Sequence, residues 1–414
     1  MSQEQQQIFP YLQRLLNGAP VEWKPLGEVT KYEQPSKYIV KNTDYKDYYH
    51  TPVLTAGKSF ILGYTNEDTG IYEASSSPVI IFDDFTTDIK WVDFDFKVKS
   101  SAMKLITSTD EDKVLLRYLY FLLTTMNDAT TVAEHKRQWI SNYCKKSVPI
   151  PPMEVQERIV EILDKFTELQ AELQAELALR EKQYIYFRDQ LLSFEMLNRG
   201  GYSLNDIKYL PLGEVMDTVT DFTAAGSFAS NAKNVKYLDF PSYAMLVRTT
   251  DLKQSFTNTK NFVYVDEHAF DYLWRVNLDK ESIILPNVGN CGEVYYLLPK
   301  DLPTKNCVLG PNALLLRSQQ VNNRYLYYLF QGINFQKELS KITSSTGQTK
   351  FNKTNLKKII IPIPPMEEQE RIVGILDRFE TMVHSIKEGL PREIELRRKQ
   401  YEYFRDQLLA FPKG

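Results

Sequence analysis

Two long stretches of the chain place apolar residues three or four positions apart, the spacing that gives a helix one hydrophobic face. Each stretch follows a proline pair, Pro151-Pro152 or Pro364-Pro365, which fixes an extended entry. Polar and charged residues fill the other faces, so we expect the two helices to pack on each other as an antiparallel coiled coil. A helix buried in a bundle is the alternative. The residues expected to pack the helices together are Ile162, Phe166, Leu169, Leu173, Leu177, Ile375, Phe379, Val383, Ile386 and Leu390.

The segments that precede these helices mix strand patterns with helix patterns. The predicted strands are Val79–Phe82, Ile89–Lys99, Phe262–Val265, Ser282–Leu285 and Val294–Leu298, and the predicted helices cover Val114–Leu123 and Arg324–Phe330. The hydrophobic pattern therefore predicts an α+β chain, with two globular α/β domains joined by two long helices.

Three blocks of sequence occur twice, in the same order. Their copies are residues 25–29 and 211–215 (both PLGEV), 148–166 and 361–379, and 177–194 and 394–411. In the second pair 15 of 19 positions are identical, and in the third pair 13 of 18 are identical. Self-similarity of this length indicates a pseudo-twofold internal repeat.

The repeat divides the chain into variable and shared parts. The segments between PLGEV and the proline pairs look unrelated to each other. The predicted plan is a globular domain with an N-terminal helix at residues 1–150, a shared helical spacer at 151–200, a second globular domain at 201–363 and a second spacer at 364–414. Residues 11–16 resemble the end of each shared block, so we expect the two termini to meet and close a pseudo-symmetric ring.

Both spacers contain a feature that affects their length. Residues 168–177 read ELQA-ELQA-EL, and each such tetrad lengthens a helix by about 6 Å at ~1.5 Å per residue. We therefore expect the length of this helix to act as a ruler. The second spacer is four residues longer between matched positions (offsets of 217 and 213), and Gly389 and Pro391 are predicted to kink or interrupt it.

Composition narrows the class of protein. The 414 residues are 43% hydrophobic and 25% charged, enough for several packed cores. Cys144, Cys291 and Cys307 lie far apart without a CxxC pair, which argues against a disulfide framework or a cysteine zinc site. The N-terminal residues lack the pattern of a signal peptide, and no window is apolar enough to span a bilayer. The sequence thus predicts a soluble, cytoplasmic protein.

The distribution of charge indicates a polyanionic partner, although the net charge is −3. Residues 301–361 hold nine Lys or Arg and two Asp or Glu, a local charge of +7. This region ends in SSTGQTKFNKTNLKK at 344–358, and the first domain has HKRQW at 135–139, followed by Asn142, Lys145 and Lys146. Cations, amides and hydroxyls are the groups that contact phosphates and base edges. A solvated basic face is the alternative for either cluster alone.

Motifs for catalysis are missing from the sequence. A nucleobase methyltransferase would be expected to show an Asn/Asp-Pro-Pro-Tyr motif and a Gly-rich loop after a strand, and we find neither. Asp83, Asp84, Asp88 and Lys90 loosely imitate a nuclease metal site, but their close spacing inside a hairpin favours a turn. The four histidines show no metal-ligand spacing. We therefore expect neither catalytic residues nor a metal or cofactor site in this chain.

The repeated blocks, the tetrads, and the first-domain runs TPVLTAGK at 51–58 and VIIFDDFTT at 79–87 together carry a family resemblance. Over essentially its whole length the chain resembles the specificity (S) subunits of type I restriction-modification systems, the HsdS family. The resemblance implies that each globular domain is a target recognition domain that reads one half of a split, asymmetric DNA sequence. It also implies that the shared helices space these halves and hold two modification (methyltransferase) subunits.

The resemblance further implies a non-catalytic chain within a larger complex on double-stranded DNA. Its modification subunits would use S-adenosylmethionine, and its restriction subunits, an ATP-dependent translocase and endonuclease, would use ATP and Mg²⁺. The candidate DNA-contacting residues are Lys58, Lys136, Arg137, Gln138, Trp139, Lys145, Lys146, Gln348, Thr349, Lys350, Asn352, Lys353, Lys357 and Lys358. Among the aromatic residues, Trp139 is the candidate for stacking on a base.

Two other functions fit parts of the sequence. A coiled-coil adaptor with two protein-binding heads would explain the helices and would need no basic faces. A self-sufficient enzyme with fused recognition domains is opposed by the missing motifs. A steep loss of affinity with rising salt distinguishes a DNA reader from the adaptor.

Overall fold

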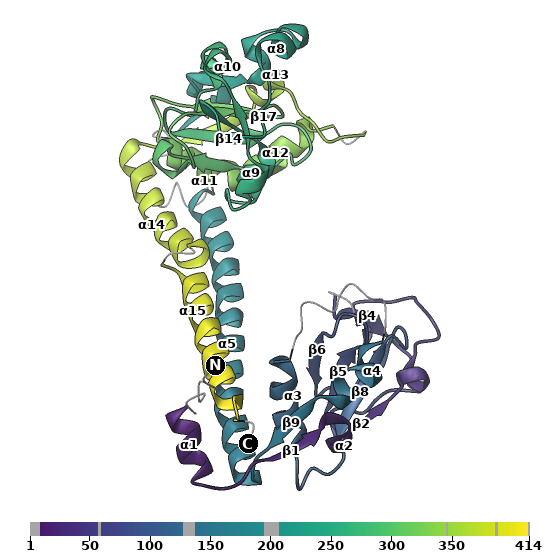
Figure 1. The fold of residues 1–414 in the computed structure, drawn as a ribbon. Coiled ribbons are helices and arrows are strands. Elements are labelled where there is room, and N and C mark those ends of the chain that lie inside the picture. The colour runs from purple at the N-terminus through teal and green to yellow at the C-terminus, as the bar shows by residue number, and fades with distance from the viewer. Residues whose placement is uncertain are drawn as a thin grey trace, which may run out of the picture. The chain divides into compact units, whose positions relative to one another are not determined.

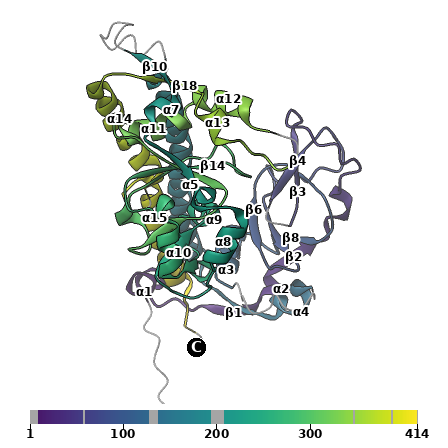
Figure 2. The same ribbon diagram turned by 90° about the horizontal axis from the view of Figure 1, so that it is seen from above.

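The structure is a computed structural model that describes residues 9–56, 59–126, 137–193, 207–344, 347–385 and 388–412. The chain forms two compact units, which can be followed in Figures 1 and 2. Unit 1 comprises residues 1–175 and 393–414, and unit 2 comprises residues 176–392. The division falls inside the predicted spacers, so each unit combines one globular domain with the adjoining parts of the long helices.

Unit 1 contains three small β-sheets. The strand orders are β1 (Glu22–Pro25), β9 (Ser147–Ile150); β2 (Thr30–Glu33), β8 (Met103–Ser108), β5 (Val79–Asp83), β6 (Ile89–Val92); and β4 (Ile61–Thr65), β3 (Thr51–Leu54), β7 (Lys97–Val98). All neighbouring strands are antiparallel except β3 and β7. The continuous apolar run of β5 explains its position, because this strand is buried along its whole length.

Unit 2 repeats these three sheets with the same strand order. They are β10 (Lys208–Pro211), β18 (Ile360–Ile363); β11 (Thr218–Asp221), β17 (Ala313–Arg317), β14 (Ser282–Pro286), β15 (Tyr295–Leu297); and β13 (Val263–Val265), β12 (Ala244–Val247), β16 (Cys307–Leu309). Again all neighbours are antiparallel except one pair, β12 and β16. The segments that look unrelated in sequence therefore share one topology, which the sequence comparison missed.

The likeness extends to one helix in each unit. α3 (Leu116–Thr124) and α11 (Asn323–Gln331) both contain Arg-Tyr-Leu-Tyr, at residues 117–120 and 324–327. The Tyr118 hydroxyl donates to the Pro149 carbonyl at 2.9 Å, and the Tyr325 hydroxyl donates to the Pro362 carbonyl at 3.1 Å. These four residues were the signal in the sequence that the two variable segments are related.

The long helices follow the predicted stripes. α5 (Met153–Leu191) begins directly after Pro151-Pro152, whereas the second spacer forms two helices, α14 (Met366–His384) and α15 (Leu390–Leu409). This interruption confirms the one predicted near Gly389 and Pro391. A Cβ at Gly389 would lie 2.4 Å from the Thr381 carbonyl oxygen and 2.5 Å from that of Met382, so the chain passes here where only glycine fits.

The helices pack against each other within each unit. In unit 1 the Phe166 ring of α5 stacks on Phe404 of α15, with ring centroids 5.5 Å apart. In unit 2 Phe187 of α5 stacks on Phe379 of α14, also at 5.5 Å. These are the same contact made twice, because Phe166 and Phe379 are repeat equivalents, as are Phe187 and Phe404. In unit 2 a second contact, between Tyr184 and His384, shows that α5 and α14 run antiparallel.

The predicted packing residues are mostly at these contacts. Val383 is buried, and Ile162, Leu177 and Phe379 lie against a core. Leu169, Leu173, Ile375 and Leu390 are half-buried, and Ile386 lies outside the described residues. The N-terminal helix α1 (Pro10–Leu16) shares a core with Leu408, Leu409 and Phe411, so the described ends of the chain meet in unit 1 as expected.

The predicted strands and helices of the globular domains are present, with one error. Residues Ile89–Lys99 do not form one strand, because β6 and β7 belong to different sheets. Between them the Asp93 carboxylate accepts the Trp91 indole N–H at 3.2 Å and the Asp95 carboxylate accepts the Ser75 N–H at 3.0 Å, side-chain contacts that take the chain out of the first sheet. The alternation of apolar residues continues to Lys99, beyond the end of β6 at Val92, so it predicted too long a strand.

Short helices connect these elements. The α-helices are α2 (Leu26–Val29), α4 (Gln138–Ser141), α7 (Leu212–Val215), α8 (Phe228–Asn234), α9 (Thr249–Lys253), α10 (Glu267–Tyr272), α12 (Ile333–Ile342) and α13 (Lys353–Leu356). The 3₁₀ helices are Pro35–Tyr38, Tyr143–Lys145, Phe222–Ala225, Thr259–Asn261, Trp274–Val276 and Pro299–Asp301. Among the described residues, every buried apolar cluster lies wholly within one unit. Within the same ranges, none of the helices has the length and apolar character needed to cross a bilayer.

Candidate nucleic-acid interface

The basic segment of unit 2 is tied to the loop that follows β14. The Asn287 carbonyl accepts the Phe351 N–H at 3.1 Å, and the Gly289 N–H donates to the Thr349 carbonyl at 2.8 Å. Val288 and Lys350 form an isolated β-bridge. Gly289 has a φ of +84°, which a residue with a side chain rarely adopts. The segment 347–352 is thus held at the end of a buried central strand.

Most polar side chains of this segment point to solvent. Gln348, Lys350, Asn352, Lys357 and Lys358 are exposed. The Asn352 side chain also caps α13, because its carbonyl oxygen accepts the Asn355 N–H at 2.8 Å. The other two candidates are engaged, since the Thr349 hydroxyl donates to the Gly289 carbonyl and the Lys353 ammonium lies 3.0 Å from an Asp221 carboxylate oxygen.

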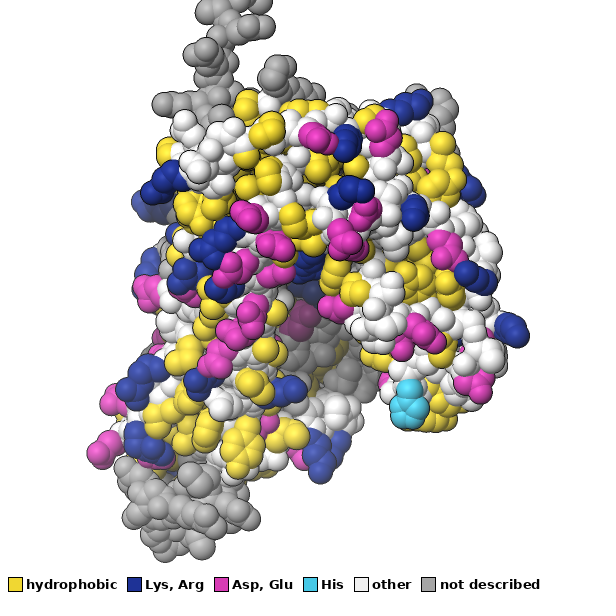
Figure 3. All heavy atoms as spheres, turned by 90° about the horizontal axis from the view of Figure 1, so that it is seen from below, with side chains coloured by type: hydrophobic (Ala, Val, Ile, Leu, Met, Phe, Trp, Pro, Cys, Tyr) yellow, Lys and Arg dark blue, Asp and Glu magenta, His cyan; other side chains and the backbone are white. Residues whose placement is uncertain are grey.

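The local charge of +7 is partly neutralised by the fold. Four of the nine cations are paired with carboxylates: Arg317 with Asp279, Arg324 with Asp377 and Glu380, Lys341 with Glu338, and Lys353 with Asp221. Lys350, Lys357 and Lys358 form no ion pair with the residues that the structure describes. Figure 3 shows one face of the molecule, on which cations and carboxylates are interspersed. The candidate interface of unit 2 is therefore the short stretch of residues 350–358, which contains these three lysines.

The corresponding segment of unit 1 is anchored in the same way. The Asp84 carbonyl accepts the Gln138 N–H at 2.9 Å, and an Asp84 carboxylate oxygen accepts the Trp139 N–H at 2.8 Å. Asp84 follows β5 as Asn287 follows β14, so the first of these hydrogen bonds has its counterpart in unit 2. Asp84 is itself buried, with the Lys104 ammonium 3.7 Å away.

Two of the candidate residues in unit 1 require correction. The Trp139 side chain is 0% exposed and packs edge-on against Phe82, with ring centroids 4.9 Å apart. Gln138 is 6% exposed. Both fill the core below β5, so neither can stack on or hydrogen-bond a base in this structure. Trp139 and Tyr143 are four residues apart, and this helical spacing of two aromatic residues was a signal in the sequence for burial on one face. In the structure their rings stack with centroids 6.4 Å apart.

The remaining unit 1 candidates are cations. Arg137 and Lys145 are exposed, and Lys146 is half-buried with its ammonium 4.2 Å from the centre of the Tyr143 ring. Lys58 and Lys136 lie outside the described residues. Arg137 and Lys145 are the repeat equivalents of Lys350 and Lys358, each 213 positions earlier. Each unit therefore carries two exposed cations at matched places, directly before the shared helix.

The acidic residues near β5 form a turn, as the sequence analysis favoured. An Asp83 carboxylate oxygen accepts the Phe85 N–H at 2.8 Å and the Thr86 N–H at 3.2 Å. Asp88 pairs with Lys90 at 2.9 Å on the surface. In the part of the chain that the structure describes, no group of His, Cys, Asp and Glu is arranged to hold a metal ion.

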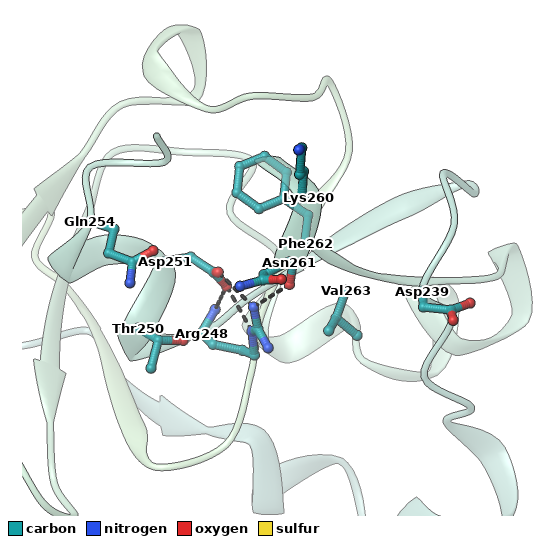
Figure 4. Close-up of a pocket in the computed structure, with 9 residues that line it drawn as sticks. All are labelled: Asp239, Arg248, Thr250, Asp251, Gln254, Lys260, Asn261, Phe262 and Val263. Atoms are coloured by element: carbon teal, nitrogen blue, oxygen red, sulfur yellow. Dashed lines mark hydrogen bonds and ion pairs between the residues drawn. The ribbon is translucent and has the colours of Figure 1, made fainter. Parts of the chain in front are cut away.

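A separate cavity of about 470 Å³ lies in unit 2, beside β13 (Figure 4). The Arg248 guanidinium binds both carboxylate oxygens of Asp251, at 2.8 and 2.9 Å, and donates to the Asn261 carbonyl at 2.6 Å. This side-chain hydrogen bonding raises the pKa of Arg248, although burial opposes it. The charge at the centre of the cavity is thus already satisfied by the protein, which makes it a structural feature of the fold.

Comparison with known proteins gives one consistent family. The family model described as the type I restriction modification DNA specificity domain matches residues 20–179 and again 206–396. The specificity subunit of the type I restriction enzymes EcoR124I and EcoR124II of Escherichia coli is 44% identical over 413 residues, which is 97% of each chain.

Two solved structures share the fold. The S subunit of a type I restriction-modification system from M. genitalium matches with a TM-score of 0.53 and 12% identity, covering 96% of this chain and 98% of the other. A chain from a structure described as the basis of complex assembly and conformational transition of the type I R-M system matches with a TM-score of 0.58 and 18% identity, covering 95% and 98%. On its sequence, its duplicated domain and its fold, the chain belongs to the family of type I restriction-modification DNA specificity subunits.

Proposed function

We propose that this chain is the subunit that selects the DNA sequence in a type I restriction-modification complex, with one half of a split, asymmetric target read by each globular domain. The observation that best supports this proposal is that one three-sheet topology occurs twice, each time attached to a repeated helix. The two copies differ in the side chains that they expose at matched positions. Unit 1 presents Arg137 where unit 2 presents Lys350, and unit 2 exposes Asn352 where the equivalent Trp139 of unit 1 is buried. Two different readers on one repeated support fit an asymmetric, bipartite duplex.

Within this proposal the exposed cations meet phosphates and the exposed amides meet bases. Lys and Arg neutralise phosphates, whereas Gln and Asn make two hydrogen bonds to adenine. Gln348 and Asn352 are the exposed amides of the segment 347–352 in unit 2, and they flank Lys350 in the sequence. The chain itself carries out no reaction, and methylation and cleavage belong to partner subunits that use S-adenosylmethionine, ATP and Mg²⁺.

The long helices carry a second repeated surface, which we assign to partner docking. Leu179 and Tyr186 of α5 are 58% and 60% exposed, and their repeat equivalents Leu396 and Tyr403 of α15 are 44% and 56% exposed. Residues seven positions apart lie on one helix face. Beside them the same hydrogen bond recurs, from the Arg180 guanidinium to Glu176 at 2.7 Å and from Arg397 to Glu393 at 2.8 Å.

Two copies of one surface fit two copies of one partner, and we assign them to two modification subunits. Restriction subunits would join through this assembly. All three cysteines are free thiols, which suits the reducing cytoplasm where we place the complex.

DNA binding is tested with the chain assembled with its methyltransferase subunits. Selection from randomised duplexes should recover two short half-sites separated by an unread gap, with affinity falling steeply as salt rises. K350A should reduce affinity by about 1 to 3 kcal/mol and relax one position if Lys350 reads a base, or weaken all sequences equally if it meets phosphate. K300A, at an exposed lysine elsewhere in unit 2, is the control. One continuous site, or affinity that does not depend on salt, would favour the adaptor function.

Docking is tested by counting bound subunits with native mass spectrometry. The wild-type chain should bind two methyltransferase subunits, and Y186A or Y403A should each bind one, because each variant damages one of two equivalent surfaces. The double variant should bind none. I333A removes a large exposed side chain from α12 and should leave the count at two. Two bound copies on the double variant would show that these faces do not dock the partner.

A further inference from the structure

In each unit one arginine is enclosed by three aromatic rings at the junction of the globular domain and the long helix. The Arg117 guanidinium of α3 lies 4.6 to 4.9 Å from the ring centres of Trp91, Tyr120 and Phe121. Its Nε and Nη2 both contact one carboxylate oxygen of Asp164, on α5, at 2.7 Å. Three aromatic rings therefore surround this guanidinium, and one carboxylate oxygen holds two of its nitrogens.

Unit 2 repeats the arrangement with more hydrogen bonds. The Arg324 guanidinium of α11 lies 4.7 to 4.9 Å from the ring centres of Tyr296, Tyr327 and Tyr328. Its Nε contacts Asp377 of α14 at 2.7 Å, and its Nη2 contacts Glu380. We call each arrangement, Arg117 with Asp164 or Arg324 with Asp377, a clamp.

The tyrosines of the second clamp are part of its network. The Tyr327 hydroxyl donates to Glu380 at 2.7 Å, and the Tyr328 hydroxyl donates to Asp377 at 2.6 Å. Burial, reinforced by the Glu380 carboxylate, raises the pKa of both tyrosines, so they remain hydrogen-bond donors at neutral pH. In unit 1 residue 167, the equivalent of Glu380, is a threonine. The first clamp is therefore the simpler of the two.

The clamp residues come from both parts of the chain plan. Arg117 and Arg324 belong to the Arg-Tyr-Leu-Tyr of the variable segments, whereas Asp164 and Asp377 belong to the repeated Ile-Leu-Asp of the shared helices. Each clamp is thus a direct link between the part that would read DNA and the part that supports it. A simple role in core packing would not require a charged group at this position.

We propose that Arg117 and Arg324 are positioning residues that fix the angle between each recognition domain and its helix, and through this angle set the gap between the two DNA half-sites. This inference rests on the proposed function. A domain of this size gives a lever of about 20 Å. A rotation of about 10° at the clamp would then move the reading surface by about 3.5 Å, which is close to one base-pair step of about 3.4 Å.

The experiment uses the full chain assembled with its methyltransferase subunits, and a pool of duplexes with randomised half-sites and gaps of up to about ten base pairs, one helical turn. The wild-type complex should favour one gap over its neighbours by about tenfold or more. R117K and R324K keep the charge but lose the planar guanidinium, which contacts the aromatic rings and holds a carboxylate through two nitrogens. Both should select unchanged half-site sequences with a preference between neighbouring gaps that falls to about threefold or less, and R324K should have the larger effect.

The controls separate positioning from loss of stability. V53A and V308A each remove methyl groups from a fully buried site in one globular domain, away from the clamps, and should lower the amount of folded protein without changing the gap preference. An unchanged gap preference in both arginine variants would overturn the inference. Loss of half-site recognition by folded R117K and R324K would overturn it as well. A wild-type complex without a two-part target would instead contradict the proposed function.

Discussion

One buried glutamine in each repeat joins the long helix to the segment before α3 or α11. The Gln156 side chain accepts the Leu115 N–H at 3.0 Å and donates to the Lys113 and Pro151 carbonyls, both at 2.9 Å. Its equivalent, Gln369, accepts the Asn322 N–H at 2.9 Å and donates to the Pro364 carbonyl at 2.8 Å. Buried backbone groups require such partners. The glutamine of the repeated block is therefore a structural link.

Replacing Gln156 should destabilise unit 1. Q156A removes the side-chain partner of three backbone groups, one buried and two partly buried, so the free energy of unfolding should fall by about 2 to 4 kcal/mol. Urea unfolding followed by circular dichroism would measure this loss. Q174A, at an exposed position of the same helix, should change the value by less than about 0.5 kcal/mol. Equal stability of the two variants would argue against the assigned hydrogen bonds.

For single residues, the sequence predicted the exposed cations correctly but did not predict which aromatic side chain is buried. Arg137, Lys145 and Lys350 are exposed cations, whereas Trp139 is enclosed by aromatic rings. A cluster of basic residues marks a segment that is exposed to solvent, but the side chain of an aromatic residue within it can point into the core. Only the fold of β5 and α4 shows which direction Trp139 takes.

At the scale of elements, the hydrophobic pattern located most helices and strands but not their pairing. The apolar stripes predicted α5, and Gly389 with Pro391 predicted the interruption between α14 and α15, because helix periodicity, glycine and proline all act locally. The parallel pairing of β3 with β7, and its repeat in β12 with β16, joins segments distant in the chain. Such pairing depends on tertiary packing, so propensity and alternation could not predict it.

Two glycines of the second spacer should respond in opposite ways to alanine. A Cβ at Gly389 would meet two carbonyl oxygens at 2.4 and 2.5 Å, whereas a Cβ at Gly374, inside α14, would meet no atom within 4 Å. G389A should therefore destabilise the chain, and G374A should stabilise it by up to about 1 kcal/mol through helix propensity. Thermal unfolding of both variants beside the wild type would measure the two effects. A destabilising G374A, or a neutral G389A, would contradict the described geometry.

At the scale of the whole molecule, the ELQA tetrads lie where the chain passes from one unit to the other. The division between the units falls after Ala175, inside the tetrads at 168–177. Leu169 and Leu173 are only half-buried there. The length of α5 at this point is therefore little constrained by either core, which supports the expectation that it acts as a ruler.

Deleting residues 170–173 should change the preferred gap between half-sites. The deletion shortens α5 by about 6 Å and turns the following part by about 40°. Because one base-pair step is about 3.4 Å, the preferred gap should change by one to two base pairs, or binding should be lost. Selection from duplexes with varied gaps would measure the change. Replacing Gln170, Glu172 and Leu173 with alanine keeps the helix length and should preserve the wild-type gap. An unaltered gap after the deletion would refute the ruler.

The confinement of each buried apolar cluster to one unit has an evolutionary consequence. A recombination event that replaced the coding sequence of residues 176–392, which form unit 2, with that of a different relative would leave the hydrophobic clusters of the described residues whole. The hybrid would inherit two intact readers in a new combination, and its target would change in a single event. A DNA-recognition protein with a single hydrophobic core across both domains would have to change its DNA contacts one residue at a time.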